Sequence, residues 1–159
     1  MELGSLSQDG DGRWTLTFER RFSNTPEFVW RALIGPAHLS KWFPADVDLR
    51  LEPGATLHYT FRDGEGMALE GRMLESEPRR LLVCTWDTAM LRFELHEEGP
   101  DVVLRFTYTF DDRDDAARDA ASWHACLDLL EAEVGGEAQR ASSAERLAAV
   151  APAYAARMG

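Results

Sequence analysis

Residues 20–43 read RRFSNTPEFVWRALIGPAHLSKWF, and this stretch decides the fold class. Thr25 can cap a helix that begins at Pro26, because its hydroxyl accepts an unpaired backbone N–H and proline suits the first helical position. The next apolar residues recur at helical spacing and form a stripe: Val29, Trp30, Leu33 and Ile34. Gly35 and Pro36 then end this helix and open a second one, with a left-handed cap expected at the glycine. The stretch therefore predicts two short helices at a sharp angle.

On both sides of this stretch, apolar and polar residues alternate with the period of half-buried strands. Alternating strands are expected at residues 13–19, 47–51, 57–61, 69–73, 91–95 and 102–110. A further strand is expected at residues 81–86, which are β-rich and nearly continuous in apolar character, so that their facing is ambiguous. The turns between them include Pro53-Gly54, a hairpin loop at residues 63–66 and a turn at residues 98–101. This spacing predicts an antiparallel sheet with one dry face. Many aromatic residues share that face: Trp14, Phe18, Tyr59, Phe61, Phe93, Phe106 and Tyr108.

A long helix at about residues 115–134 is expected to cover the dry face of the sheet. One apolar stripe runs along it at intervals of four and three residues: Ala116, Ala120, Trp123, Leu127, Leu130 and Val134. Gly135 and Gly136 suit the end of this helix, since glycine accepts a left-handed cap. The helix and the sheet would bury their apolar sides against each other.

The 159 residues are expected to form a single domain, residues 1–159. Its core would span about residues 13–136, and residues 137–159 would be a polar, alanine-rich tail that is partly helical. Three residues could give this tail an apolar side: Leu147, Val150 and Tyr154. Pro152 is expected to interrupt that helix, because proline lacks the backbone N–H that a helix needs.

The charge balance excludes some partners. With 17 basic and 28 acidic side chains the formal net charge is −11, which argues against nucleic acid and against anionic membrane surfaces. No apolar run is long enough to span a membrane, and the N-terminus lacks the features of a secretory signal, so a cytoplasmic protein is expected. Cys84 and Cys126 are too few for a disulfide framework and are expected to be reduced.

The order of these elements resembles the helix-grip fold of the START/SRPBCC superfamily. The pattern R-x-F-x-x-x-P-x-x-V-W-x-A-L at residues 20–33 and P-x-x-L-x-x-W-F at residues 36–43 are similar to its AHSA-like branch (activator of Hsp90 ATPase homologue-like). Further matches are Gly54, G-x-M at residues 71–73, E-x-E-P at residues 75–78, and Trp123, Leu127 and Leu130 on the last helix. The resemblance covers roughly residues 13–136.

The resemblance implies an α+β helix-grip fold. A curved antiparallel sheet of about six or seven strands would wrap around the long C-terminal helix, with two short helices after the first strand. It also implies an elongated cavity between that helix and the sheet. Relatives in the superfamily include lipid carriers, plant hormone-binding proteins, polyketide aromatase/cyclases and a eukaryotic co-chaperone, so the resemblance implies a fold and a pocket but no single reaction.

The sequence shows no recognisable catalytic or metal-binding constellation. The four histidines are scattered without metal-ligand spacing: His38, His58, His96 and His124. Strand parity predicts that His58 and His96 face solvent, and His124 is expected at the flank of the long helix rather than in the cavity. The carboxylate-rich residues 111–115 lack the glycine and distal glutamate of a calcium loop, which favours a solvated helix cap. We therefore expect no catalytic residue, no metal and no cofactor.

The leading functional hypothesis is non-catalytic binding of a small hydrophobic molecule, such as a lipid, an aromatic or a polyketide-like compound. The same aromatic face could also be plain core packing. The side chains expected to line the ligand cavity are Trp30, Trp42, Tyr59, Phe61, Met73, Trp86, Phe93, Phe106, Tyr108, Trp123, Leu127 and Leu130.

Two alternatives stay open at this point. One is a polyketide cyclase- or hydrolase-like enzyme, with Tyr59, Tyr108 or His58 transferring protons. The other is a chaperone-associated protein-interaction module in stress response, in which case a chaperone would be a partner. Because no acid/base pair is recognisable, the sequence favours binding over catalysis.

Overall fold

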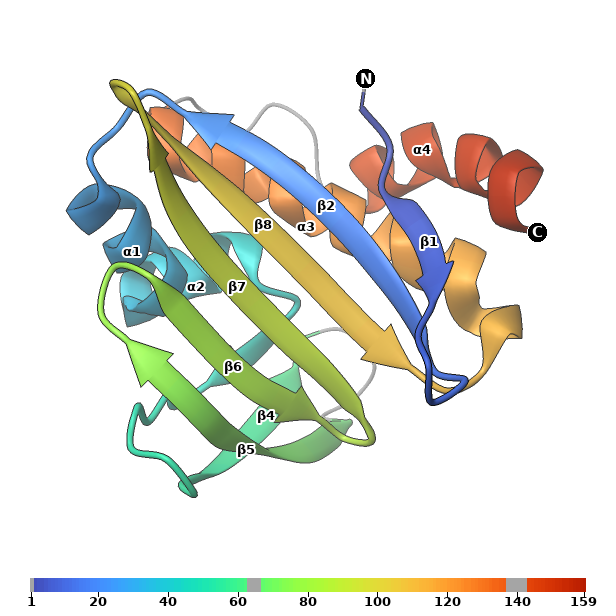
Figure 1. Cartoon of the computed structure of the whole chain (residues 1–159), viewed down its shortest axis with the longest axis horizontal. Coiled ribbons are helices and arrows are strands. Elements are labelled where there is room, and N and C mark those ends of the chain that lie inside the picture. The colour runs from blue at the N-terminus through green and yellow to red at the C-terminus, as the bar shows by residue number, and fades with distance from the viewer. Residues whose placement is uncertain (1, 63–66, 137–142) are drawn as a thin grey trace.

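The computed structural model describes residues 2–62, 67–136 and 143–159. Its sheet has eight antiparallel strands in the order β1-β2-β8-β7-β6-β5-β4-β3 (Figure 1). The strands are β1 (Ser5–Gln8), β2 (Trp14–Phe22), β3 (Ala45–Val47), β4 (Thr56–Phe61), β5 (Ala68–Glu77), β6 (Leu81–Trp86), β7 (Ala89–Glu98) and β8 (Asp101–Phe110). The helices are α1 (Pro26–Ile34), α2 (Pro36–Trp42), α3 (Ala116–Gly135) and α4 (Ser143–Met158).

The two short helices form as predicted. The Thr25 hydroxyl accepts a hydrogen bond from the backbone N–H of Phe28 at 3.2 Å, and α1 begins directly after Thr25, at Pro26. The expected left-handed cap at Gly35 is wrong, since its φ of −73° is ordinary. Glycine is needed there for space, because a Cβ atom would lie 2.8 Å from the carbonyl oxygen of Arg31. The indole N–H of Trp42 donates to the carbonyl of Ala32 at 2.8 Å and fixes α2 against α1.

Strands β2 and β4–β8 lie where the sequence predicts them, but both edges of the sheet differ. The expected strand at residues 47–51 is instead the short β3, and residues 48–51 have no regular structure. The additional strand β1 pairs with β2 through a register that sets Leu6 opposite Leu16. Its sequence, SLSQ, is largely exposed and has little apolar alternation, so hydrophobic patterning cannot reveal it. The predicted hairpin loop at residues 63–66 lies outside the described residues.

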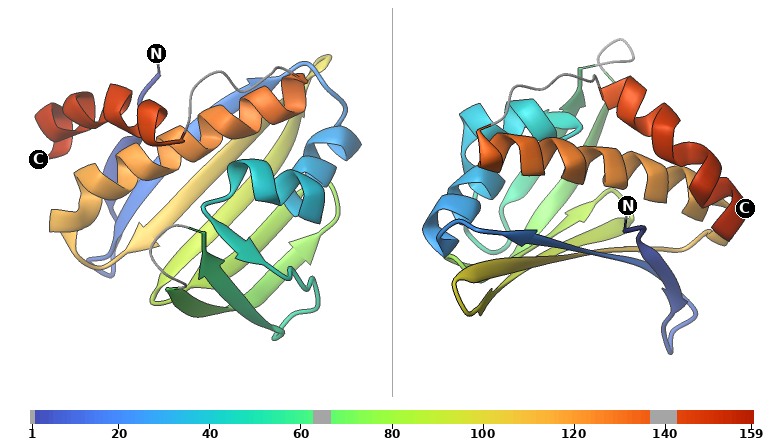
Figure 2. Two further views of the ribbon diagram at one scale, coloured as in Figure 1. Left: turned by 180° about the vertical axis from the view of Figure 1, so that it is seen from behind. Right: turned by 90° about the horizontal axis from the view of Figure 1, so that it is seen from above.

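The helix α3 lies across one face of the curved sheet (Figure 2). All six residues of its predicted stripe are buried. It ends as expected, with Gly136 in the left-handed conformation at φ 70°. Ahead of it, the Asp112 carboxylate accepts from the backbone N–H of Asp114 at 2.9 Å, so this acidic segment caps a short 3-10 turn that leads into α3. None of the described helices is long and apolar enough to cross a membrane.

The tail contains the helix α4, which packs against α3 (Figure 2). The expectation that Pro152 interrupts this helix is wrong, because α4 continues through it. Pro152 and Ala148 are both exposed, so water can hydrate the Ala148 carbonyl that loses its helical partner. Burial of Val150 and Tyr154 holds the helix on both sides of the proline.

A buried polar chain ties the N-terminal segment to α3 and α4. The Tyr154 hydroxyl accepts from the backbone N–H of Gly4 at 2.8 Å and lies 2.7 Å from His124 Nδ1. With the Tyr154 proton donated to Nδ1, the neutral imidazole carries its own proton on Nε2, the nitrogen that faces Asp128. That nitrogen is 3.6 Å from Asp128, which in turn pairs with Arg20 at 3.4 Å.

Acid is expected to weaken the fold through this histidine. Burial lowers the pKa of His124 from its usual 6.5, Asp128 acts in the opposite direction, and Arg20 lowers it further. As the pH falls, the unfolded chain therefore takes up a proton at His124 at a higher pH than the folded protein does. The free energy of unfolding should be highest above the ordinary pKa of 6.5 and fall as the pH drops below it.

Urea denaturation at several values between about pH 5 and pH 8 measures this dependence. His124→Gln should flatten it, whereas replacing the exposed His58 by Gln should leave the slope unchanged. A His124→Gln protein with the slope of the wild type would show that another group is responsible.

Candidate functional site

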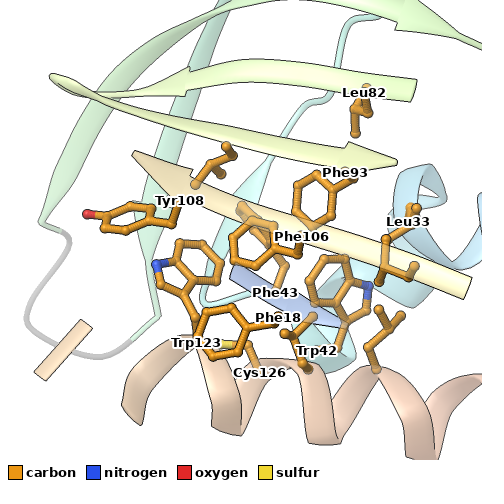
Figure 3. Close-up of a cluster of buried hydrophobic side chains, with 14 of the residues drawn as sticks. Phe18, Leu33, Trp42, Phe43, Leu82, Phe93, Phe106, Tyr108, Trp123 and Cys126 are labelled. Carbon is orange, nitrogen blue, oxygen red and sulfur yellow. The ribbon is translucent and has the colours of Figure 1, made fainter. Parts of the chain in front are cut away.

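An aromatic cluster fills the space between α3 and the sheet (Figure 3). Trp123 of α3 lies at its centre. The centroid of its ring is 5.0 Å from Phe106, 5.5 Å from Trp86 and 5.7 Å from Tyr108. On the side of the short helices it is 6.1 Å from Phe43, which follows α2. The sheet, the long helix and the end of α2 are thus joined through one tryptophan.

The twelve residues predicted to bind a ligand are largely members of this packed core. Ring contacts within the cluster involve Trp42, Tyr59, Phe61, Trp86, Phe93, Phe106, Tyr108 and Trp123. Met73, Leu127 and Leu130 are fully buried in the same core, and Trp30 is buried on α1.

The interior beside this cluster holds little free space. A cavity of about 20 Å³ lies against it, lined by side chains that include Leu33, Trp42, Tyr59, Cys84 and Phe93. That is room for about one water molecule. In this conformation the helix-to-sheet interior is therefore packed too closely at this point to hold an organic ligand.

The polar groups of the core are used structurally. The Tyr59 hydroxyl donates to the carbonyl of Thr85 at 2.9 Å, and burial raises the pKa of this phenol. The Cys84 sulfur lies 3.6 Å from the same hydroxyl. Burial raises the pKa of the Cys84 thiol to about 11, although its hydrogen bond with Tyr59 acts to lower that pKa. Burial and the nearby Asp119 carboxylate raise the pKa of Tyr108. All three groups are therefore protonated at neutral pH.

A larger hollow opens on the other side of the same aromatic residues. It has a volume of about 550 Å³, within the usual range for small-molecule sites. We call it the α2–α4 groove, and it is lined by Ser40, Lys41, Trp42, Phe43, Pro44, Phe61, Arg62, Ser122, Ala125, Cys126, Leu129, Ala144 and Leu147. Nine of these thirteen residues are apolar, and they come from α2, the segment after it, β4, α3 and α4.

Three rings of the groove belong also to the aromatic cluster: Trp42, Phe43 and Phe61. Phe43 lies 5.5 Å from Trp86 and 6.0 Å from Tyr59, and Phe61 lies 5.5 Å from Trp86. These two phenylalanines thus form a shared wall between the packed core and the groove. A molecule in the groove would rest on side chains whose positions the core already fixes.

The rim of the groove carries fixed positive charge. Arg62 donates from one guanidinium nitrogen to the Asp46 carboxylate at 2.7 Å and from another to the backbone carbonyl of Phe43. Lys41 lies 3.6 Å from the Glu133 carboxylate. At the floor, burial raises the pKa of the Cys126 thiol to about 12 while the positive charge of Arg62 acts to lower it. Cys126 is therefore a neutral thiol near neutral pH and suits contact rather than nucleophilic attack.

Other hollows on the described surface are more polar. One of about 490 Å³ lies between the end of β2 and α3 and includes Arg21, Asn24, Asp128 and Glu131. Its exposed lining is mainly polar, whereas the α2–α4 groove exposes slightly more apolar than polar surface. The groove is for this reason the better candidate for an organic ligand.

Sequence reasoning found only part of the groove. Trp42 and Phe61 are the two predicted ligand residues that line it. Phe43 could have been included, because it ends the P-x-x-L-x-x-W-F pattern. No sequence pattern indicated that Arg62 or Ser122 would line a binding site. The apolar stripe of α3 describes only the side that faces the sheet, and the groove forms only where α4 packs beside α3.

Eight strands curved around a long C-terminal helix, with two short helices after β2, define a helix-grip protein of the START/SRPBCC class. The sequence model of one family, described as "Activator of Hsp90 ATPase homolog 1-like protein", matches residues 23–135. The chain belongs to this family. The match confirms the AHSA-like resemblance, and the sheet confirms the predicted fold with a slightly higher strand count.

Solved structures share the fold. The chain is similar to a conserved protein of unknown function from Enterococcus faecalis, with 21% identity and a TM-score of 0.76 over 97% of this chain and 89% of that one. It is also similar to CalU16 from Micromonospora echinospora, at 19% identity and a TM-score of 0.73, over 96% and 94% of the two chains. A protein encoded by BPP1335 from Bordetella parapertussis is 28% identical, with a TM-score of 0.75 over 90% and 85%. No curated protein matches the sequence.

Proposed function

We propose that this protein binds a small hydrophobic molecule in the α2–α4 groove without transforming it. The observation that carries the proposal is a hollow of about 550 Å³ next to the aromatic cluster, in which nine of the thirteen lining residues are apolar. The family and its fold often bind hydrophobic ligands, which agrees with this use of the groove. Lipids, aromatics and polyketide-like compounds are the classes that suit such a lining.

The groove is the place for this ligand because the core is already occupied. Placing a ligand between α3 and the sheet would displace rings such as Trp123 and Phe106, whose centroids are 5.0 Å apart. Opening such a packed core costs several kcal/mol. A ligand in the groove needs no such displacement, and it can still contact the outer sides of Phe43 and Phe61.

The two alternatives have less support among the described residues. His58 is exposed and pairs with Glu70 at 3.7 Å on a strand face opposite to Tyr59, so the candidates for proton transfer do not converge. A chaperone-binding module would be favoured by a contiguous apolar patch. Among the described residues only four large apolar side chains are exposed: Phe28, Met67, Leu74 and Leu147.

Filling the groove should abolish ligand binding. Ser122 is half-buried in the lining, and Ser122→Trp would place an indole in the hollow. We expect 1-decanol to raise the unfolding temperature of the wild type in a concentration-dependent way and to leave that of Ser122→Trp unchanged. A matched control is Ala149→Trp, which adds the same side chain at an exposed position of α4 and should keep the response. A full response in Ser122→Trp would exclude the groove as the site.

A further inference from the structure

The α2–α4 groove differs in charge from the rest of the chain. The protein carries a formal net charge of −11. Among the described residues that line the groove, the charged ones are nevertheless both cations, Lys41 and Arg62, and none is Asp or Glu. By comparison, the polar hollow beside β2 includes both Asp128 and Glu131. The groove therefore combines an apolar lining with local positive charge on an acidic protein.

Arg62 is held at the rim rather than free to move away. Its hydrogen bonds to the Asp46 carboxylate and to the carbonyl of Phe43 use two nitrogens of the guanidinium. A guanidinium has five N–H donors, so those two bonds leave capacity for a further acceptor. Because the side chain is already fixed, binding a ligand through it costs less conformational entropy than ordering a mobile lysine.

The acidic partner of Arg62 offsets only part of its positive charge inside the groove. Asp46 is not among the lining residues, and its side chain is 62% exposed, so water solvates that carboxylate. The Arg62 side chain is 36% exposed and lines the hollow itself. Its charge also reaches the floor, where it acts on the thiol of Cys126.

We infer that the ligand of the groove is an anionic amphiphile, whose carboxylate or similar head group binds Arg62 while its apolar body lies on Phe43 and Phe61. This inference rests on the proposed function and adds the chemical class of the ligand. Lys41 adds to the positive potential at the same rim, but its side chain is 59% exposed against 36% for Arg62, so Arg62 is the main contact. A charge-assisted hydrogen bond at a partly desolvated rim is stronger than a neutral one, and it selects an acid over the matching alcohol.

Decanoate and 1-decanol test this directly, because they share one chain length and differ in the head group. Calorimetric titration below the micelle concentration should show that decanoate binds the wild type more tightly. Arg62→Gln should weaken the binding of decanoate by about tenfold and leave the binding of 1-decanol unchanged. The matched control is Arg50→Gln, which makes the same change in net charge at a side chain that is 64% exposed and outside the groove lining, and it should change neither affinity.

A second variant keeps the test informative if Arg62→Gln does not fold. Asp46→Asn removes the carboxylate that competes for the guanidinium, so it should strengthen decanoate binding and leave decanol binding unchanged. Equal affinity of the wild type for the acid and the alcohol would overturn the anionic head group while the hydrophobic site stands. An equal loss of decanoate binding in Arg62→Gln and Arg50→Gln would also overturn it. Failure of both ligands to bind would reject the proposed function together with the inference.

Discussion

Trp123→Ala should lower the free energy of unfolding by about 3–5 kcal/mol. The side chain is 4% exposed, and its ring packs against Phe106 at 5.0 Å, Trp86 at 5.5 Å, Tyr108 at 5.7 Å and Phe43 at 6.1 Å. These partners come from two strands and from the segment after α2, so they cannot all move inward to fill the space that the indole leaves. The cost is therefore the lost burial plus that of a cavity.

Chemical denaturation followed by circular dichroism measures this loss. Trp14→Ala is a suitable control, because Trp14 is half-buried at the start of β2 and carries the Arg113 guanidinium 5.7 Å from its ring. It should lose clearly less stability than Trp123→Ala. If the two variants lose the same amount, Trp123 is not the centre of the core. A loss of decanol binding in Trp123→Ala is also expected, because Phe43 would lose a supporting contact at the wall of the groove.

Gly71→Ala should destabilise the protein by about 3 kcal/mol or more, although it adds a single methyl group. A Cβ atom at this position would lie 2.0 Å from the carbonyl oxygen of Thr85 and 2.9 Å from the ring of Tyr59. That same carbonyl accepts the Tyr59 hydroxyl at 2.9 Å. The methyl group would thus push β6 away from β5 and break the hydrogen bond that orients the tyrosine.

The matched control for this variant is Gly10→Ala. Gly10 lies in the turn between β1 and β2, whereas Gly71 lies within β5, and a Cβ atom at Gly10 would meet nothing within 4 Å. Its unfolding midpoint should stay close to that of the wild type. A Gly71→Ala protein as stable as Gly10→Ala would mean that β5 and β6 can separate at this point without cost.

Much of the fold could be predicted because its signals are local. Thr25 and Pro26 start α1 through their own chemistry, and the stripe from Ala116 to Val134 sets the face that α3 turns to the sheet. The strands β2, β4, β5, β7 and β8 carry alternating apolar residues, since one side of each faces the core, whereas β6 is almost continuously apolar. In these elements the residues of each segment alone predict which of its sides is buried.

The remainder depends on contacts between distant segments. The strand β1 is held mainly by backbone pairing with β2, which leaves little trace in its side chains. The sequence predicts His124 at the flank of α3, and the side chain does lie outside the aromatic cluster. It is nevertheless buried, because Tyr154 of α4, thirty residues further along the chain, packs against it. The groove likewise exists only once α4 lies beside α3, so its lining could not be read from the stripe of either helix.

The titration of 1-decanol into the wild type tests ligand binding in the groove most directly, when it is followed residue by residue by ¹H–¹⁵N NMR. The predicted result is a saturable set of shifts centred on Phe43, Arg62, Ser122 and Cys126, which the Ser122→Trp protein does not show. Shifts confined to other surfaces, or no saturable shifts at all, would contradict the groove as the functional site.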